Sequence, residues 1–162
     1  MRILEAQEIK SLQPIIEQAT NTAYQSPCRK SKRGVVIFKG NQVLGAGFNS
    51  PTLPRRCFGE LCAEVCNFYT IHAERNAVHD ALARGSDLAE SSILHIRIKE
   101  GEFGWQVTPA DKTTCDDCVP YLLRIEATLP APFREFILHH NLGYIALTLP
   151  EMKTDEIARM VD

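Results

Sequence analysis

Hydrophobic positions recur at helical spacing in four segments of the chain. In the first, apolar side chains three and four positions apart line one face, with Ser11 as N-cap and Pro14 in the first turn, where a missing N–H is tolerated. In the second, alanines every four positions share a face, and Gly85 supplies the C-terminal stop. The third needs a place for Pro120 near its first turn. The predicted helices cover residues 11–25, 72–84, 115–127 and 151–161.

Short apolar runs between these helices predict five strands. Gly40 and Asn41 separate the first two strands, and both residue types tolerate the positive φ of a two-residue hairpin. Only Asn141, Leu142 and Gly143 separate the last two, too few for a crossover helix, so we expect an antiparallel pair. The strands cover residues 34–39, 42–48, 92–99, 135–140 and 144–149. Loops are expected over residues 50–70, with a short helix near 60–68, and over residues 100–114.

The order of these elements predicts an α/β fold. We expect a three-layer α/β/α sandwich, with helices on both faces of a mixed five-stranded sheet, because hairpins alternate with helix-linked strands. The chain has 162 residues, of which 44% are hydrophobic, and this fits a single domain over residues 1–162.

Charge and hydropathy narrow the class of protein. The 18 basic and 20 acidic residues give a net charge of -2, which argues against a protein that holds nucleic acid by charge alone. No apolar run is long enough to span a membrane, and the first ten residues lack the apolar stretch of a secretory signal. We therefore expect a cytoplasmic protein with neither a membrane nor a nucleic acid as partner.

Six cysteines are a distinctive feature of the composition. Without an export signal, a disulfide framework is the weaker interpretation, and such cysteines more often bind metal, do redox chemistry or lie buried. They are Cys28, Cys57, Cys62, Cys66, Cys115 and Cys118.

Two short motifs together predict a catalytic metal site. His72-Ala73-Glu74 begins one predicted helix, and the pair Cys115 and Cys118, in Cys-Asp-Asp-Cys, begins another. One imidazole and two thiolates are the three protein ligands of an open zinc site, which leaves the fourth tetrahedral position for water. Both thiolates would lie at a helix N-terminus, where the dipole favours the ionised form. Glu74, two residues beyond His72, can reach that water without being a ligand.

Each motif also has a simpler explanation. A Cys-x-x-Cys pair can be a redox centre, although that centre usually follows an early strand of a βαβ unit. His72, Cys115 and Cys118 can instead hold a structural zinc or be buried thiols. Glu74 can be a solvated carboxylate in the first turn of a helix.

Taken together, the motifs resemble the zinc-dependent cytidine/deoxycytidylate deaminase superfamily, whose signature is His-x-Glu followed by Pro-Cys-x-x-Cys. The segments SPCRKSKRGVVIFKGNQVLGAGFN and CNFYTIHAERNAV are also similar to members of that family. The element order matches over roughly residues 11–149, and the specific motifs lie within 28–49, 66–78 and 115–118.

The resemblance implies zinc-dependent hydrolytic deamination of a cytosine-type nucleoside or nucleotide by a homo-oligomer. Zn²⁺ would activate a water, and Glu74 would carry protons to the ring nitrogen and to the departing amino group. The backbone N–H of Ala73 would hold an oxygen, and Asn49 would bond a sugar hydroxyl or the base. Asn49 can equally be a turn residue that follows a strand.

The chain departs from the family pattern in three places. Thr114 stands where the family has the proline before its first cysteine, and the segment GEFGWQVTPADKTT makes the loop between the third predicted strand and Cys115 longer than usual. The C-terminal hairpin is similar to the free-nucleoside branch, whereas Gly47-Phe48-Asn49 and the cysteine-rich loop are similar to the deoxycytidylate branch. These differences leave the substrate open.

The remaining cysteines and the basic clusters give two further hypotheses. Cys28, Cys57, Cys62 and Cys66 could close a second, structural zinc site, as deoxycytidylate deaminases often have, or be partly buried free thiols. The basic side chains could hold a phosphate or simply be solvated. They are Arg29, Lys30, Lys32, Arg33, Arg55 and Arg56.

Other functions remain as alternatives. A deaminase of single-stranded nucleic acid would need more positive charge and more aromatic side chains near the motifs. Two more alternatives are a deaminase of guanine-type heterocycles and a non-catalytic zinc-stabilised binding module. Glu74 argues against the binding module. His79, His95, His139 and His140 are interpreted as surface or hydrogen-bonded histidines.

Overall fold

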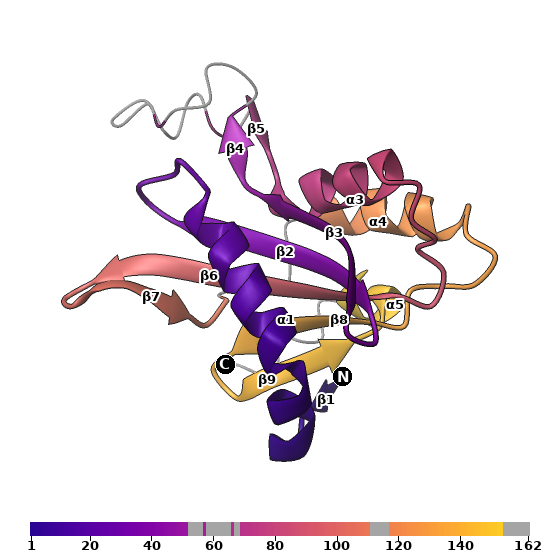
Figure 1. Ribbon diagram of the computed structural model, residues 1–162, viewed down its shortest axis with the longest axis horizontal. Coiled ribbons are helices and arrows are strands. Elements are labelled where there is room, and N and C mark those ends of the chain that lie inside the picture. The colour runs from indigo at the N-terminus through magenta and orange to yellow at the C-terminus, as the bar shows by residue number, and fades with distance from the viewer. Residues whose placement is uncertain (52–56, 58–65, 67–68, 111–116, 154–162) are drawn as a thin grey trace.

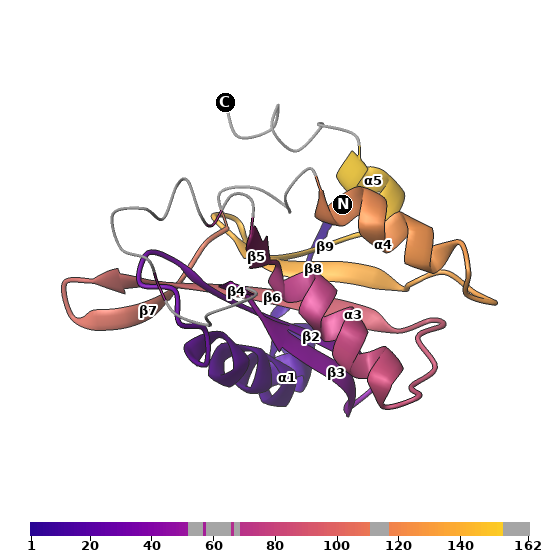
Figure 2. The same ribbon diagram turned by 90° about the horizontal axis from the view of Figure 1, so that it is seen from above.

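The protein folds into three layers, with one mixed β-sheet between helices on its two faces (Figure 1). Helix α1 (Ala6–Tyr24) covers one face, and α3 (Ala73–Ala83), α4 (Cys118–Glu126) and α5 (Leu149–Lys153) cover the other (Figure 2). The expected α/β/α sandwich is confirmed. The computed structural model describes residues 1–51, 57, 66, 69–110 and 117–153.

Seven strands of the described chain form the main sheet, in the order β1-β9-β8-β6-β2-β3, with β7 paired to β6 outside that path. Strands β6 and β8 run parallel and the other pairs are antiparallel, so the sheet is mixed, as expected. All five predicted strands are present. The predicted total of five strands is wrong, because β1 and β7 also belong to the sheet. Short strands β4 and β5 pair separately. The bounds are β1 Arg2–Ile3, β2 Lys32–Lys39, β3 Gln42–Phe48, β4 Ser50–Pro51, β5 Thr70–Ile71, β6 Ser92–Gly101, β7 Gly104–Thr108, β8 Glu135–His140 and β9 Gly143–Leu147.

The loop expected over residues 100–114 is partly a hairpin. Strand β6 continues to Gly101, and β7 returns along it after a turn that uses the positive φ of Gly104, 98°. Figure 1 shows this hairpin extending beyond the rest of the sheet. Because most of β7 is exposed, it needs no continuous apolar run, and the pattern that predicts core strands does not detect it.

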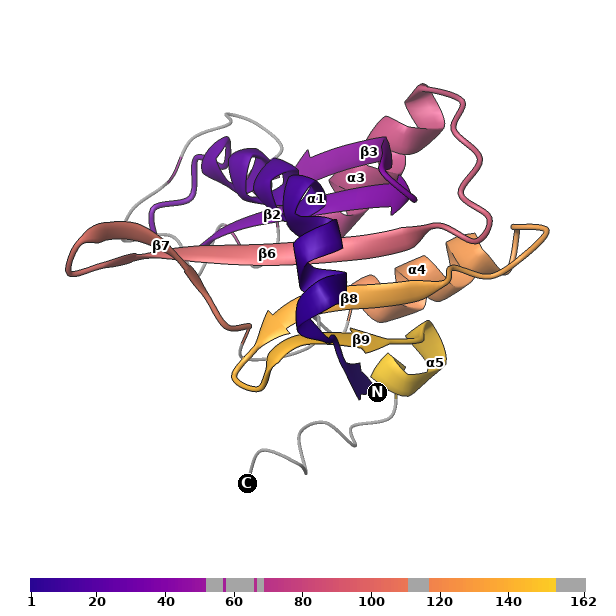
Figure 3. The same cartoon turned by 60° about the horizontal axis from the view of Figure 1, so that its bottom comes forward.

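Helix α1 begins earlier than its apolar pattern indicates. The N-cap is Glu5, which forms a capping box with Glu8, so Ser11 is not the cap and Pro14 lies inside the helix. The Ser11 hydroxyl instead donates to the carbonyl of Gln7 at 2.9 Å. The predicted apolar face is correct, since Ile15, Ile16, Ala19 and Ala23 are buried there. Figure 3 shows α1 crossing the sheet on this face.

The other face of the sheet holds α3 unusually close to the first hairpin. A Cβ placed on Gly47 of β3 would lie 2.2 Å from the backbone nitrogen of Ala77, and one on Gly45 would lie 2.5 Å from the carbonyl oxygen of Ala77. Only glycine fits where a helix backbone lies directly against a strand. These two glycines therefore set the position of α3, the helix that begins after His72.

Replacing Gly47 by alanine should lower the free energy of unfolding, because the new methyl group meets helix backbone rather than a flexible side chain. Overpacking of this kind costs about 1–3 kcal/mol or more. Urea unfolding would measure it, with Gly101→Ala as the matched control, since a Cβ there has its nearest contact at an ordinary 3.6 Å. Equal midpoints for the two variants would contradict this close packing.

The C-terminal half completes the layer. Helix α4 begins at Cys118, and Pro120 lies in its first turn, as predicted. The hairpin of β8 and β9 is antiparallel, also as predicted. The closing helix starts at Leu149 rather than at 151, and residues 154–161 lie outside the described chain. Within the described residues, none of the helices has the length and apolar character needed to cross a membrane.

Candidate metal centre and active site

Two helix N-termini place the predicted ligands together. His72 is the N-cap residue of α3, with extended backbone (φ −71°, ψ 154°), and its carbonyl accepts the N–H of Asn76 at 3.1 Å. Just before it, β5 pairs with β4, and Ile71 lies opposite Ser50, so the sheet fixes how the chain enters the helix. Cys118 is the first residue of α4 and is fully buried.

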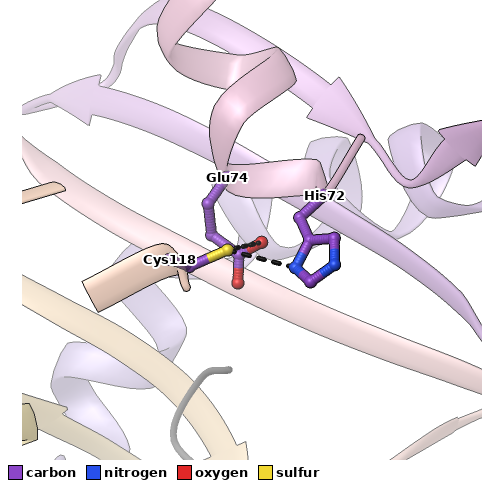
Figure 4. A group of neighbouring side chains, drawn as sticks. All are labelled: His72, Glu74 and Cys118. Atoms are coloured by element: carbon purple, nitrogen blue, oxygen red, sulfur yellow. Dashed lines mark hydrogen bonds between the residues drawn. The ribbon is translucent and has the colours of Figure 1, made fainter. Parts of the chain in front are cut away.

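The side chains of His72, Glu74 and Cys118 point toward one another (Figure 4). Their ligand atoms all lie within 4.8 Å of one another, with His72 Nδ1 3.2 Å from Cys118 Sγ. Cys118 Sγ lies 3.6 Å from Glu74 Oε2. A tetrahedral zinc with ordinary bond lengths separates its nitrogen and sulfur ligands by roughly 3.6 Å. The imidazole and the thiol are thus at nearly the spacing that a shared Zn²⁺ requires.

Arg75 connects the two helices beside this cluster. Its guanidinium lies 5.1 Å from the ring centroid of Tyr121 on α4, and its Nη2 donates to the carbonyl of Asp117 at 3.4 Å. A cation above an aromatic ring is attracted by the negative charge density of the ring face. Arg75 therefore helps to hold the start of α4 against the start of α3.

Glu74 is buried, with 4% of its surface exposed, so the alternative of a solvated carboxylate in the first turn is wrong. Burial raises the pKa of Glu74, but His95, its own backbone N–H, His72 and Arg33 together lower that pKa below its ordinary value. The lowered pKa favours the carboxylate form of Glu74, which can accept a proton.

The other predicted site residues have mixed outcomes. Ala73 is the first residue of α3, where the helix leaves backbone N–H groups unused. The side-chain amide of Asn49 accepts the N–H of Arg33 at 2.7 Å and donates to the carbonyl of Ser31 at 3.1 Å. These contacts tie Asn49 to the start of β2, and its role toward a substrate stays a prediction. Cys115 and Thr114 lie outside the described residues.

The second metal site also stays a prediction. Cys28, Cys57 and Cys66 are partly buried, and Cys62 lies outside the described chain. Among the residues with described positions, the one group that could hold a metal is His72, Glu74 and Cys118.

Two basic residues at the start of β2 lie on opposite faces of the sheet. The Lys32 ammonium donates to the carbonyls of Tyr24 and Ser26 and lies 5.0 Å from the centroid of the Trp105 ring. Arg33 instead reaches His95, with Nη1 3.5 Å from Nε2. Of the other basic residues, Arg29 and Lys30 are exposed. Arg55 and Arg56 lie outside the described residues.

Two buried polar residues on β6 were missed by the sequence interpretation. His95 is 1% exposed and Arg97 is 5% exposed, and both share a face of β6 with the core residue Ile93. The interpretation of His95 as a surface histidine is wrong, but its Nε2 does contact Arg33, and the Nδ1 atoms of His95 and His139 are buried without a partner among the described residues. The strict alternation of SILHIRIK, with two polar residues on a face that also carries isoleucine, could have indicated them.

A separate cleft of about 790 Å³ lies between the start of α1, the β2–β3 turn and the segment before β8. None of its lining residues belongs to the metal cluster. Its charged groups largely neutralise one another, because Arg2 pairs with Glu8 and Glu135, and Lys39 lies 3.9 Å from Glu90. We assign it no ligand.

Comparison with known proteins identifies the same region of the chain. A family model described as the cytidine and deoxycytidylate deaminase zinc-binding region matches residues 9–127. The chain is similar to the dCMP deaminase of cyanophage S-TIM5 in complex with dCMP and dUMP, at 20% identity, a TM-score of 0.53, and coverage of 75% of this chain and 76% of that one. That likeness supports the fold. No curated protein matches the chain.

Two further solved structures are similar to the chain at lower scores. The apo form of the phage enzyme has 15% identity and a TM-score of 0.49, and covers 75% of this chain and 78% of that one. A diaminohydroxyphosphoribosylaminopyrimidine deaminase/5-amino-6-(5-phosphoribosylamino)uracil reductase from Thermotoga maritima has 16% identity and a TM-score of 0.45, and covers 72% of this chain and 27% of that one.

Proposed function

Because the chain belongs to the cytidine and deoxycytidylate deaminase family, we propose that it deaminates a cytosine-type nucleoside or nucleotide by zinc-dependent hydrolysis. The observation that carries this proposal is the buried carboxylate of Glu74 beside His72 and Cys118. A structural zinc site closes all four positions with ligands and has no use for a buried proton acceptor. His72, Cys118 and, from the sequence motif, Cys115 would hold the metal.

The chain's own residues would divide the chemistry as follows. When bound, zinc supplies the Lewis-acid chemistry that makes water nucleophilic near neutral pH. Glu74 would accept one proton of the attacking water at Oε2 and pass it to the ring nitrogen. It would then accept the second proton of that water and pass it to the amino group, which leaves as ammonia. The backbone N–H of Ala73, in the first turn of α3, would donate to an oxygen on the substrate.

Ammonia release from a panel of substrates tests the proposal. The panel is cytosine, cytidine, deoxycytidine, dCMP, guanine and single-stranded DNA, each with zinc-loaded protein. We expect turnover of the cytosine nucleosides or of dCMP. Release from guanine alone or from DNA alone would instead support the corresponding alternative deaminase. Zinc-loaded protein inactive on the whole panel would support the binding module.

The same panel tests whether the basic cluster holds a phosphate. Since Lys32 and Arg33 already contact the protein, the exposed Arg29 and Lys30 are the members best placed to meet one. A charge-assisted contact should favour dCMP over deoxycytidine by about 10–100-fold in kcat/KM. The double variant Arg29→Ala, Lys30→Ala should lose this preference, and Arg124→Ala, an exposed control on α4, should keep it. Equal kcat/KM for dCMP and deoxycytidine would rule out phosphate recognition.

A further inference from the structure

His95 is a buried polar residue that the proposed reaction does not yet use. It lies in the middle of β6, opposite Val35 of β2 and Leu138 of β8, two residues of the core beneath α3 and α4. Its ring centroid is 6.3 Å from that of Phe136 in the same core. His95 therefore faces the layer that also contains Glu74, and its imidazole has the largest influence of any neighbouring ionisable group on that carboxylate.

The neighbour of His95 determines which ring nitrogen carries the proton. Arg33 Nη1 lies 3.5 Å from His95 Nε2, and a guanidinium can only donate a hydrogen bond. Nε2 must then accept, so the neutral ring has its proton on Nδ1. Burial, together with the Arg33 and Arg97 cations, lowers the pKa of His95 to about 4 against the opposing effect of Glu74, so the ring is neutral near pH 7.

This Nδ1–H group has no acceptor among the described residues, although it is fully buried. Buried polar groups nearly always have a hydrogen-bond partner, so this donor, unpaired among the described residues, is a candidate to pair with a bound ligand. The position of this Nδ1–H group indicates which acceptor it meets. In cytosine, the ring nitrogen that Glu74 would protonate is bonded to the carbon that carries the ring carbonyl oxygen. A substrate positioned for Glu74 brings an acceptor close to the same place.

We propose that His95 is a specificity-determining residue, whose Nδ1–H donates a hydrogen bond to the ring carbonyl oxygen of a cytosine-type substrate. The inference rests on the proposed deaminase function. It predicts discrimination against rings that have a C–H group in place of that carbonyl, as adenine does, because the buried donor would then stay unpaired.

Two amide substitutions separate this role from a structural one. In His95→Asn the amide nitrogen is attached to Cγ, as Nδ1 is in histidine. It can therefore still donate a hydrogen bond toward the substrate, but the shorter side chain cannot reach Arg33. In His95→Gln the amide lies at the distance of Nε2, so it keeps the contact with Arg33 and loses the donor. We expect kcat/KM for the best cytosine substrate to fall about 10–100-fold in His95→Gln and clearly less in His95→Asn. The exposed His79 provides the control variant His79→Gln, which should match the wild type.

A modified substrate and a spectroscopic measurement complete the test. A 2-thio analogue, whose sulfur is a weak acceptor, should lower kcat/KM for the wild type but have little further effect in His95→Gln. Nitrogen-15 NMR of the wild type should show the Nδ1–H tautomer near pH 7, whatever the activity. The Nε2–H tautomer, or a His95→Asn variant as impaired as His95→Gln, would overturn the inference while leaving deamination intact. A wild type inactive on every cytosine substrate would reject the proposed function itself.

Discussion

Glu74→Gln should remove most deaminase turnover while leaving the folded protein and its zinc content close to those of the wild type. Glutamine has the shape of glutamate and can still form hydrogen bonds, but it cannot accept the proton that Glu74 is proposed to move. General acid–base catalysis is typically worth about 100–10,000-fold, and here one carboxylate would serve several transfers. The measurement is kcat on the best substrate of the panel, with zinc counted by elemental analysis and folding followed by thermal melting.

Two outcomes would contradict this assignment. If Glu74→Gln lost its zinc, Glu74 would be a ligand, and the carboxylate would not be available to move protons. The 3.6 Å between Glu74 Oε2 and Cys118 Sγ makes this a real test, because both atoms lie close enough to share a metal. If the variant kept full activity, another group would transfer the proton, and the burial of Glu74 would have a purely structural meaning.

Removing a proposed ligand should have the opposite pattern, in which metal and activity are lost together. His72→Ala deletes the imidazole whose Nδ1 lies 3.2 Å from Cys118 Sγ, and Cys118→Ala deletes the thiol. With three protein ligands reduced to two, each variant should contain one zinc fewer per chain than the wild type and have no measurable turnover. The double variant Cys115→Ala, Cys118→Ala should lose the same single zinc.

Zinc content distinguishes the two classes of variant. Glu74→Gln serves as the control, since it alters a neighbour in the same cluster without deleting a proposed ligand. Counting zinc also tests the second site, because zinc that remains bound after His72→Ala must be held by other residues, such as the Cys57–Cys66 segment. A wild-type zinc content in His72→Ala or in the double cysteine variant would refute the catalytic assignment.

The sequence predicts the site better than it predicts the surroundings of the site. His72 and Glu74 lie in one compact motif and Cys118 lies in another, each at the start of a helix, where local spacing fixes which side chains of that motif are neighbours. The early start of α1 is harder to foresee, because Pro14 resembles a first-turn proline and nothing in the periodicity shows that the capping box lies at Glu5. A glutamate cap is uncommon beside the usual serine, threonine, asparagine or aspartate.

His95 shows a different limit of sequence interpretation. Its position in an alternating strand indicates which face it shares, but whether that face is buried depends on which helix covers it. Burial follows from α3 lying against Gly45 and Gly47, and the tautomer follows from Arg33 on the neighbouring strand. Both are long-range facts of packing, so no local pattern contains them.

The contact between His72 and Cys118 joins positions 46 residues apart. A metal bound there is also a cross-link, and it closes a loop that contains α3, β6 and β7. For a covalent bridge, closing a loop of this length removes chain entropy worth about 4 kcal/mol from the unfolded state. If a bound metal stabilised the fold by a comparable amount, this contribution would be a large share of the roughly 5–15 kcal/mol of stability that is typical of a domain. A chelator would then lower the stability of the folded protein as well as remove its activity, although Glu74 and every other residue would be unchanged.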